Sequence, residues 1–552
     1  MLRTILPLAA IATSVTLCAQ VSAGGTPYGM RHGLSMAEVP TVHAAPFDAE
    51  AAAADDARRE ALHLLPAYGR ALAVNADLDH HGLWTDLPGG DRLWRLRITS
   101  DGAQATELYF NMHLPEGASL FVQNEDGSYV LGAFTAYNNT ADGNFATGLV
   151  QGESCLVEYF EPKEARGQGQ LLVKELGHAY RMAQLGGTCE VDVNCSEGDG
   201  WEQQRDAVVR ISVLAGGINY WCSGSLVNNL EQDCKPYFLT AKHCGEGTTT
   251  SEFNLWKFYF NYEKSGCGSG AAFQNHLVTG CTKRGDSNDG GGNSGSDFLL
   301  LEAIDPDIPG AYTPFWAGWD ANNLATAGGV GIHHPAGTQK KISTYTATPF
   351  STSWGGPPGT HWGLSWVATT NGHGVTEGGS SGSPIFNGAH RIVGTLTGGA
   401  SCCTTGGCGP GTGPNAADYY GKMSYHWQSN PGSATTRLKA WLDPASTGVL
   451  SMDGSYDPCG SVIGIRENGA SAMELGLFPN PADGLFTVQL PAPAGNGTQV
   501  EVTDALGRAV RSVDPAGRSK LQLDLRGETP GVYVVRLLHA QAVLGTARLL
   551  LR

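Results

Sequence analysis

The 552-residue sequence is poor in charged residues and has fewer basic than acidic ones. Asp, Glu, Lys and Arg make up 16% of the chain, and the formal net charge is 35 − 52 = −17. Coiled coils and long helical bundles contain far more charge than this. A strongly acidic chain also binds nucleic acids and anionic membranes poorly, so we expect neither as a partner.

Long apolar runs are absent beyond the N-terminus. Met1-Leu2-Arg3 carries a positive charge, residues 5–17 are apolar, and small residues precede a cleavage position near Ala23. Because a spanning helix needs about 20 apolar residues, we interpret residues 1–23 as a secretory signal peptide. The mature protein is therefore predicted to be exported, soluble, monomeric and without a membrane-spanning segment.

Metal-binding motifs are missing as well. No pair of C-x-x-C motifs occurs and HExxH is absent, which argues against zinc. The acidic, glycine-rich segment 286–297 lacks the spacing of an EF-hand, so it leaves calcium open without predicting it. His333-His334-Pro335 has no partner motif and is predicted to be loop structure. We predict no metal and no cofactor.

Cysteine and glycine are plentiful. Of 13 cysteines, ten lie between Cys189 and Cys408, and dense cysteines in an exported segment indicate disulfides. The 76 glycines, together with the low charge, favour a turn-rich all-β protein. The region after the signal peptide opens without a clear pattern, and a helix-like stretch rich in Ala, Glu and Arg follows at 48–72.

Short alternating apolar segments then divide the chain into three β-rich regions. Strand-like runs suggest a β-sandwich at each end and a barrel protein with long loops in the middle, where only 434–441 is typical of a helix. The predicted boundaries are 24–186, 187–450 and 472–552, with a linker at 451–471.

The middle region holds the residues for nucleophilic catalysis. His243 follows an apolar strand, Asp297 begins another, and Ser381 lies in Gly378-Gly379-Ser380-Ser381-Gly382. A serine nucleophile needs a neighbouring base, and the base needs an orienting acid. The order His243, Asp297, Ser381, with gaps of 297 − 243 = 54 and 381 − 297 = 84, is the order found in chymotrypsin-like enzymes.

Two other interpretations are open. Each residue alone has an ordinary structural explanation, so the chain could be a catalytically inactive, protease-like binding protein. The serine loop also spells G-x-S-x-G around Ser380, with Asp418 and His426 downstream, as in α/β-hydrolases. That motif needs a strand, a sharp turn and a helix, whereas strand-like residues follow here.

The sequence resembles bacterial lysyl endopeptidases, which are secreted, chymotrypsin-fold serine proteases. The resemblance runs from about Cys189 to about Gly448. It is carried by these segments: Trp221 to Asn229, Tyr237 to Gly245, Ser296 to Glu302, Phe315 to Asp320, Ile332 to Pro335 and Val375 to Ile385. It implies that His243 is the general base, Asp297 its orienting acid and Ser381 the nucleophile. The backbone N–H groups of Gly379 and Ser381 would form the oxyanion hole.

The same resemblance implies a preference for basic residues. The family's pocket-floor aspartate corresponds to Asp418 in Asp418-Tyr419-Tyr420-Gly421. A buried carboxylate selects a basic side chain because an apolar one leaves it unpaired. We therefore expect protein or peptide substrates cut after Lys, with Arg open. Where the family has a histidine stacked on a tryptophan, this chain has Thr397, and the matching tryptophan is Trp354.

The resemblance also implies a maturation scheme. Residue 380 is a serine, so the trypsin ion pair between a new N-terminus and an aspartate at this position cannot form. Matching positions instead imply the disulfides Cys189–Cys403, Cys195–Cys267 and Cys222–Cys244. Cys234–Cys281 and Cys402–Cys408 are further guesses, and Cys155 and Cys459 have no predicted partner. The first region would be a propeptide, removed between Arg181 and Gly187, that assists folding or blocks the cleft.

The last 80 residues resemble the C-terminal sorting domain of the bacterial type IX secretion system. Phe478-Pro479-Asn480-Pro481, Asp504 to Arg508 and Gly531 to Leu537 carry that resemblance. It implies the type IX machinery as a partner and export across the outer membrane, with attachment to the cell surface left open. A surface-binding β-sandwich is the alternative.

Overall fold

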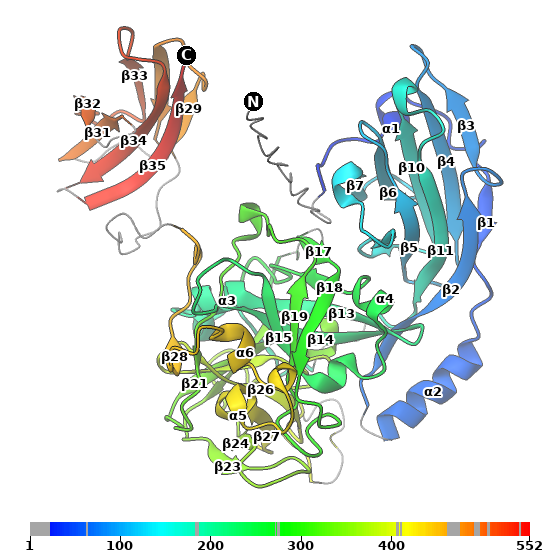
Figure 1. The fold of residues 1–552 in the computed structure, drawn as a ribbon, viewed down its shortest axis with the longest axis vertical. Coiled ribbons are helices and arrows are strands. Elements are labelled where there is room, and N and C mark those ends of the chain that lie inside the picture. Colours follow the sequence, from blue (N-terminus) through cyan, green and yellow to red (C-terminus); the bar gives the residue numbers. More distant parts are fainter. Residues whose placement is uncertain are drawn as a thin grey trace, which may run out of the picture. The chain divides into compact units, whose positions relative to one another are not determined.

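A computed structural model describes residues 22–61, 64–182, 187–270, 272, 276–403, 408, 411–460, 475–490, 497–504, 508–539 and 542–552. Strands far outnumber helices among them, which confirms the all-β prediction, and the chain divides into two compact units, Met1–Cys459 and Gly460–Arg552 (Figure 1). The proposed signal peptide falls almost wholly outside the described residues. Within them, no helix is long and apolar enough to cross a bilayer.

The N-terminal region is the predicted β-sandwich. One sheet has the order β1-β4-β10-β6-β7 with β3 paired to β4, and the second holds β2, β11, β5, β8 and β9. Buried side chains such as Trp94 and Phe110 fill the space between them. The elements are α1 (Tyr28–Arg31), β1 (Thr41–His43), α2 (Ala49–Ala61), β2 (Ala67–Asp77), β3 (Leu83–Asp86), β4 (Arg92–Thr99), β5 (Ala105–His113), β6 (Ser119–Asn124), β7 (Val130–Phe134), η1 (Ala136–Asn138), β8 (Asn144–Ala146), β9 (Val150–Gln151), β10 (Ser154–Glu161), η2 (Lys163–Ala165) and β11 (Gln170–Ala179).

The helix predicted over residues 48–72 is wrong at its C-terminal end. Helix α2 covers only Ala49–Ala61, and the chain from Ala67 onward belongs to β2. β2 pairs with β11 on one side and with β14 (Ile218–Val227) of the next region on the other. These long-range pairings override the local helix propensity.

The middle region begins with a barrel-like sheet. Its strands follow the ladder β17-β16-β13-β14-β15-β19-β18 around a core that contains Ile211, Phe238 and Leu299. The elements up to β19 are β12 (Val191–Asp192), η3 (Ser196–Gly198), α3 (Glu202–Ala207), β13 (Val208–Ala215), β14, β15 (Tyr237–Thr240), η4 (Lys242–Gly245), α4 (Thr250–Phe253), β16 (Lys257–Tyr259), β17 (Leu277–Thr279), β18 (Cys281–Asp286) and β19 (Leu299–Ala303).

A second sheet, β12-β22-β21-β25-β26-β27-β24-β23, completes this region, with β20 on β26 and β28 on β20. A shared core, with Phe298 from the first half and Ile332 from the second, joins the two halves. The remaining elements are η5 (Gly310–Tyr312), β20 (Trp319–Asp320), β21 (Gly329–His333), η6 (Pro335–Gly337), β22 (Lys341–Tyr345), β23 (Phe350–Thr352), β24 (His361–Leu364), β25 (Pro384–Asn387), β26 (Ile392–Gly399), β27 (Asp418–Lys422), α5 (Met423–Gln428), η8 (Ala434–Thr436), α6 (Lys439–Leu442) and β28 (Ser451–Met452).

The prediction of one helix in the middle region is wrong. Residues 434–441 are split between η8 and α6, and short helices also occur at α3, α4 and α5. Each of these helices has at most six residues. Helices of one or two turns have too few positions to show a periodic apolar pattern.

The C-terminal unit is the predicted small β-sandwich. Sheets β29-β30-β33 and β32-β31-β34-β35 enclose a core that contains Phe486, Val500 and Val535. Its strands are β29 (Gly476–Phe478), β30 (Leu485–Gln489), β31 (Thr498–Thr503), β32 (Ala509–Val513), β33 (Lys520–Asp524), β34 (Gly531–His539) and β35 (Ala542–Leu551).

Five disulfides lie in the first unit. The structure contains Cys189–Cys403, Cys195–Cys267, Cys222–Cys244 and Cys402–Cys408. The guess Cys234–Cys281 is wrong, because Cys234 is bonded to Cys459 and Cys281 is a free, buried thiol, as is Cys155. Cys281 lies inside the first barrel core, whereas Cys234 is partly buried and packs against that core.

Candidate active site

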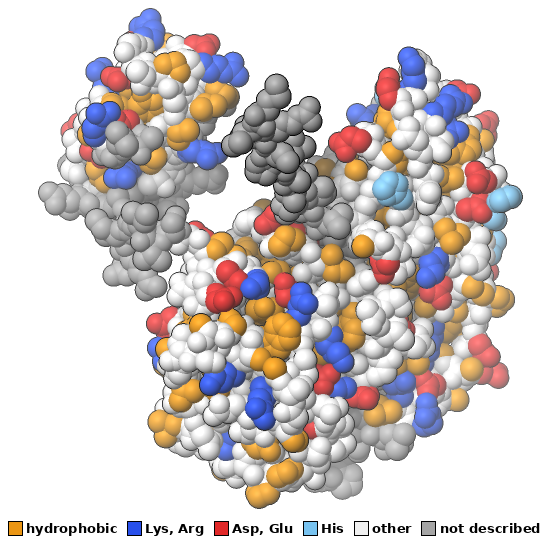
Figure 2. All heavy atoms as spheres, viewed as in Figure 1, with side chains coloured by type: hydrophobic (Ala, Val, Ile, Leu, Met, Phe, Trp, Pro, Cys, Tyr) orange, Lys and Arg blue, Asp and Glu red, His pale blue; other side chains and the backbone are white. Residues whose placement is uncertain are grey.

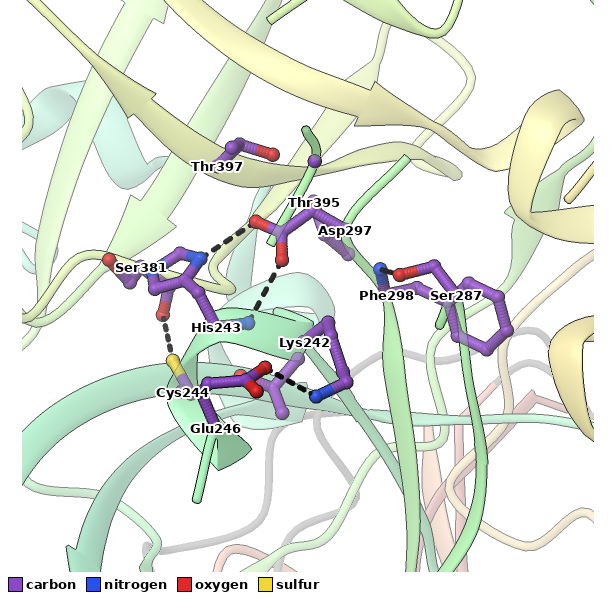
Figure 3. Close-up of polar contacts among 12 residues, drawn as sticks. Lys242, His243, Cys244, Glu246, Ser287, Asp297, Phe298, Ser381, Thr395 and Thr397 are labelled. Carbon is purple, nitrogen blue, oxygen red and sulfur yellow. Dashed lines mark hydrogen bonds and ion pairs between the residues drawn. The ribbon is translucent and has the colours of Figure 1, made fainter. Parts of the chain in front are cut away.

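His243 and Asp297 meet where β15 and β19 pair side by side. His243 lies in η4, the turn directly after β15, and Asp297 stands two residues before β19. The Asp297 carboxylate accepts the His243 backbone N–H at 2.9 Å and faces Nδ1 at 2.7 Å (Figure 3). Two bonds to one carboxylate fix both the position of the imidazole and its tautomer, with Nε2 left free to accept a proton.

The electrostatics of this pair favour a basic imidazole. Burial of the ring lowers the pKa of His243, but the charge and hydrogen bond of Asp297 outweigh burial, so the pKa is raised above its ordinary value. About a quarter of the His243 side chain reaches solvent, whereas Asp297 is fully buried. A fully buried carboxylate therefore orients an imidazole that remains partly accessible to solvent.

Ser381 lies beside the His243 ring (Figure 3). Its carbonyl oxygen accepts the Ser223 N–H of β14 at 2.8 Å, and Gly382 N–H donates to the Leu396 carbonyl at 2.8 Å. A Cβ on Gly382 would lie 2.0 Å from Thr240 Oγ1, so this position needs glycine. No hydrogen bond joins Ser381 Oγ to His243 Nε2, and such bonds are often long without substrate.

The backbone around Ser381 has N–H groups without an acceptor among the described residues. Gly379 has a φ of +100°, a conformation that only glycine adopts readily. Among the described residues, nothing accepts the Gly379 and Ser381 N–H groups, which the sequence predicts to form the oxyanion hole. Two free N–H donors beside a nucleophile can stabilise the charge of a tetrahedral intermediate.

Ser380 occupies a different environment from Ser381. Its hydroxyl is fully buried, hydrogen-bonded to His333 Nδ1 at 2.7 Å, and accepts the Glu377 N–H at 3.2 Å. His426 binds Ser296 and Thr395 instead, so the α/β-hydrolase triad of Ser380, Asp418 and His426 is not assembled. That alternative is wrong because β25, rather than a helix, follows the serine loop.

Asp418 begins β27 and is fully buried. Its carboxylate accepts Trp366 Nε1–H at 2.6 Å, the Thr376 hydroxyl at 2.8 Å, and both the hydroxyl (2.6 Å) and N–H (3.1 Å) of Ser401. Burial raises the pKa of Asp418, and these hydrogen bonds offset only part of that rise. A Cβ on Gly399 would lie 1.8 Å from Oδ1, so glycine leaves one side of the carboxylate free of side chains.

Trp354 and Thr397 both lie near Asp297, because a Cβ on Gly292 would come within 3.4 Å of all three side chains. Trp354 is 43% exposed and packs over Gly398 and Gly292, while the Thr397 hydroxyl bonds to His361 Nε2 at 3.0 Å. Burial lowers the pKa of His361 to about 4, so this ring is neutral and the bond links two uncharged groups.

Sequence reasoning missed two acids near the site. Asp289, which it grouped with a tentative calcium segment, accepts the Asp297 N–H at 2.8 Å. Glu377 accepts the Gly187 N–H at 3.0 Å, at the end of the expected propeptide. The glycines around Asp289 were the local feature of the sequence that could have drawn attention to this acid. Within the described residues, segment 286–297 contains no cluster of three metal-ligating groups.

Family comparisons agree with both resemblances. Residues 184–421 match the family model "Lysyl endopeptidase, C-terminal domain", and residues 476–549 match "Secretion system C-terminal sorting domain". A lysyl endopeptidase of Pseudomonas aeruginosa is 28% identical over 346 residues, which cover 58% of this chain and 71% of that protein. The resemblance to lysyl endopeptidases and to sorting domains is thereby confirmed.

Solved structures of serine proteases are also similar. Protease Anisep from Arthrobacter nicotinovorans has a TM-score of 0.27 and 19% identity, covering 40% of this chain and 90% of that one. The thermostable serine protease AL20 from an extremophilic microorganism has a TM-score of 0.27 and 15% identity, covering 40% and 93%.

Proposed function

We propose that this chain is a secreted serine endopeptidase that cleaves after lysine, and after arginine if the pocket admits it. The class of enzyme rests on the lysyl endopeptidase match. The observation that carries the mechanism is the buried Asp297 carboxylate holding His243 beside Ser381. No cofactor enters the proposal.

The reaction proceeds in two steps. Ser381 Oγ attacks the substrate carbonyl carbon while His243 Nε2 takes the hydroxyl proton, and the N–H groups of Gly379 and Ser381 stabilise the oxyanion. The C–N bond then breaks, and His243 gives its proton to the leaving amine. Water attacks the acyl-enzyme by the same route, which releases the carboxylic acid and restores Ser381.

Substrate choice would come from Asp418. Four hydrogen bonds hold its carboxylate, and a lysine ammonium near Oδ1 would supply the positive charge that this buried group lacks. An uncharged side chain would leave it unpaired, which is the physical basis of selectivity. Asp418→Asn should lower kcat/KM for lysyl substrates by about three orders of magnitude.

The N-terminal sandwich would be a propeptide that covers the site. Arg70, Gly69 and Ala67 of β2 pair with Ile218 to Tyr220 of β14, the strand that continues to Ser223 beneath Ser381. A Cβ on Gly378 would lie 2.8 Å from Pro66, so Pro66 sits directly on the serine loop. A full chain with Arg181→Gln should react with a serine probe at least tenfold more slowly than matured enzyme.

The C-terminal unit would direct export by the type IX machinery, as its family match implies. Deleting residues 460–552 should leave the protease in the periplasm.

On the face shown in Figure 2, acidic and basic side chains are interspersed without a large patch of either sign.

An active-site probe decides between this proposal and a catalytically inactive binding protein. Matured enzyme should be labelled, Ser381→Ala should lose labelling and about 10⁶-fold of kcat, and Ser380→Ala should keep labelling. Cleavage-site mapping on denatured proteins then tests Asp418, since cuts without basic preference would remove it from the pocket. No labelling of matured, disulfide-bonded protein would support the binding protein.

A further inference from the structure

Asp297 has an unusual backbone conformation for a catalytic carboxylate. Its φ is +59°, in the left-handed region that residues with a side chain rarely adopt. Such a conformation persists only where surrounding contacts impose it. Since the carboxylate reaches His243 from this backbone, whatever holds the conformation also sets the geometry of the triad.

Asp289 makes several of the contacts that hold it, beside the Lys242 N–H, which donates to the Asp297 carbonyl at 3.2 Å. The side chain is 4% exposed, and its Oδ2 accepts the Asp297 N–H at 2.8 Å while Oδ1 accepts the Gly292 N–H at 3.2 Å. The Asp289 carbonyl also accepts the Ser294 N–H at 3.1 Å. One residue therefore closes the loop 289–297 at both ends.

The glycines of this loop bring Asp289 close to the triad. A Cβ on Gly295 would lie 2.6 Å from Asp289 Oδ2, and one on Gly291 would lie 3.0 Å from His243 Cβ. Side chains at either place would displace the carboxylate or the imidazole. Packing against His243 and Asp289 thus explains the glycines at 291 and 295.

Asp289 also acts on His243 through its charge. The charged groups that shift the pKa of the imidazole are Asp297, Asp289 and Lys242. Both carboxylates raise the pKa of His243 and Lys242 lowers it, so Asp289 is a second negative charge behind the base. His361, close to Asp297, is neutral because burial lowers its pKa to about 4.

We propose that Asp289 is a positioning residue of the triad, which holds Asp297 in its left-handed conformation and places a second negative charge behind His243. This inference rests on the proposed function for its catalytic consequence. The hold of Asp289 on the Asp297 backbone and the effect of its charge on His243 do not depend on that function, because both exist without substrate.

The test compares Asp289→Asn and Asp289→Ala with Asp286→Asn in matured full enzyme. The amide keeps one acceptor oxygen but loses the charge, whereas alanine loses both bonds. The control Asp286 ends β18, three residues before Asp289, and its carboxylate binds Lys283 and the Asn288 N–H instead. We expect kcat to fall about tenfold to hundredfold in Asp289→Asn, more in Asp289→Ala, and less than twofold in Asp286→Asn.

The pH profile separates positioning from a general loss of folding. Removing the charge lowers the pKa of His243, so the acid limb of kcat/KM should move to lower pH in Asp289→Asn, with KM little changed. A loss of activity with an unmoved acid limb would overturn the electrostatic part, and unchanged kcat would overturn the positioning part.

Imidazole NMR gives the same answer without catalysis. The Nδ1–H resonance of His243, assigned with His243→Ala, should titrate at lower pH in Asp289→Asn and broaden in Asp289→Ala. If the wild-type enzyme proves inactive but this shift appears, the proposed function fails and the role of Asp289 stands. An identical titration in wild type and both variants would overturn the proposal.

Discussion

The two β-sandwiches at either end of the chain use the same architecture in opposite ways. In the N-terminal one, β2 pairs with β14, so a single sheet runs from the sandwich into the protease region. Glu107 and Lys257 form a 2.8 Å ion pair across this boundary, with side chains 1% and 0% exposed. In the C-terminal unit, the described strands pair only with one another, and ion pairs such as Arg526–Asp524 reach solvent.

The difference shows how a β-sandwich becomes dependent on a neighbour. Glu107 also accepts hydrogen bonds from Tyr109 and Asn219 Nδ2, and Tyr68 stacks on Trp221 at 4.1 Å. Buried polar groups of this kind are costly unless each finds its partner. The N-terminal sandwich and the protease region therefore complete each other, whereas the sorting domain encloses its own core.

Deleting each sandwich should give the largest contrast. Without residues 24–182, the edge of β14 and the Lys257 ammonium lose their partners, so we expect almost no soluble, probe-reactive protease after oxidative refolding. Without residues 460–552, refolding yield and labelling should be close to those of the full chain. Equal yields for the two deletions would contradict the contrast.

Acid should destabilise the first unit far more than the second. Four histidines are fully buried in the protease region: His333, His334, His361 and His426. Burial lowers the pKa of His333 and His426 to about 3, that of His361 to about 4, and that of His334 well below its usual range. In the unfolded chain these histidines take up protons below about pH 6.5, whereas in the folded chain they stay neutral at that pH.

The four neutral histidines thus make their full contribution to the free energy of unfolding above pH 6.5. This contribution is lost as the pH falls toward the pKa values that the histidines have in the folded chain. At pH 5 the loss is about 2 kcal/mol for each histidine. Calorimetry should show that the unfolding temperature of the first unit falls between pH 7 and pH 5. The unfolding temperature of the sorting domain, whose one histidine, His539, is exposed, should change little. Parallel shifts would refute this account.

Replacing Lys257 should weaken the shared boundary. Lys257→Met leaves the Glu107 carboxylate buried without its partner, which costs about 3–5 kcal/mol of unfolding free energy. Denaturant unfolding of the full chain measures this change. Lys257→Met combined with Glu107→Gln should recover part of the loss, and Lys520→Met on the exposed surface of the sorting domain should have no measurable effect.

The smallest expected loss of stability is for removal of the disulfide that fixes the C-terminal end of the first unit. Cys234–Cys459 closes a separation of 225 residues, and removing it should cost about 2–4 kcal/mol because the unfolded chain gains entropy. Replacing both cysteines with serine should lower the transition of the first unit alone. Cys402–Cys408 spans only 6 residues and provides the matched control with a smaller loss.

Local sequence was most informative where the chemistry itself is local. Ser381 could be found because glycines must flank an exposed hydroxyl, and the strand around Val535 because alternation shows directly which face is buried. Prediction failed at Ala67–Leu72, where a partner strand decides, and at Cys234, whose partner lies 225 residues away. The contact between Asp289 and Asp297 was missed because the Asp289 carboxylate accepts hydrogen bonds from backbone N–H groups. Almost every residue has such a group, so the sequence does not show which one is bound.

By itself, the sequence determined the all-β class and the two family resemblances, because alternation, turn residues and motifs are written within short segments. Only the tertiary structure decided which side chains meet. The sheet shared through β2 and β14, the burial of Ser380 against His333, and the hold of Asp289 on Asp297 each join residues through long-range or backbone contacts. Such contacts depend on how strands pack, and packing leaves no local pattern in the chain.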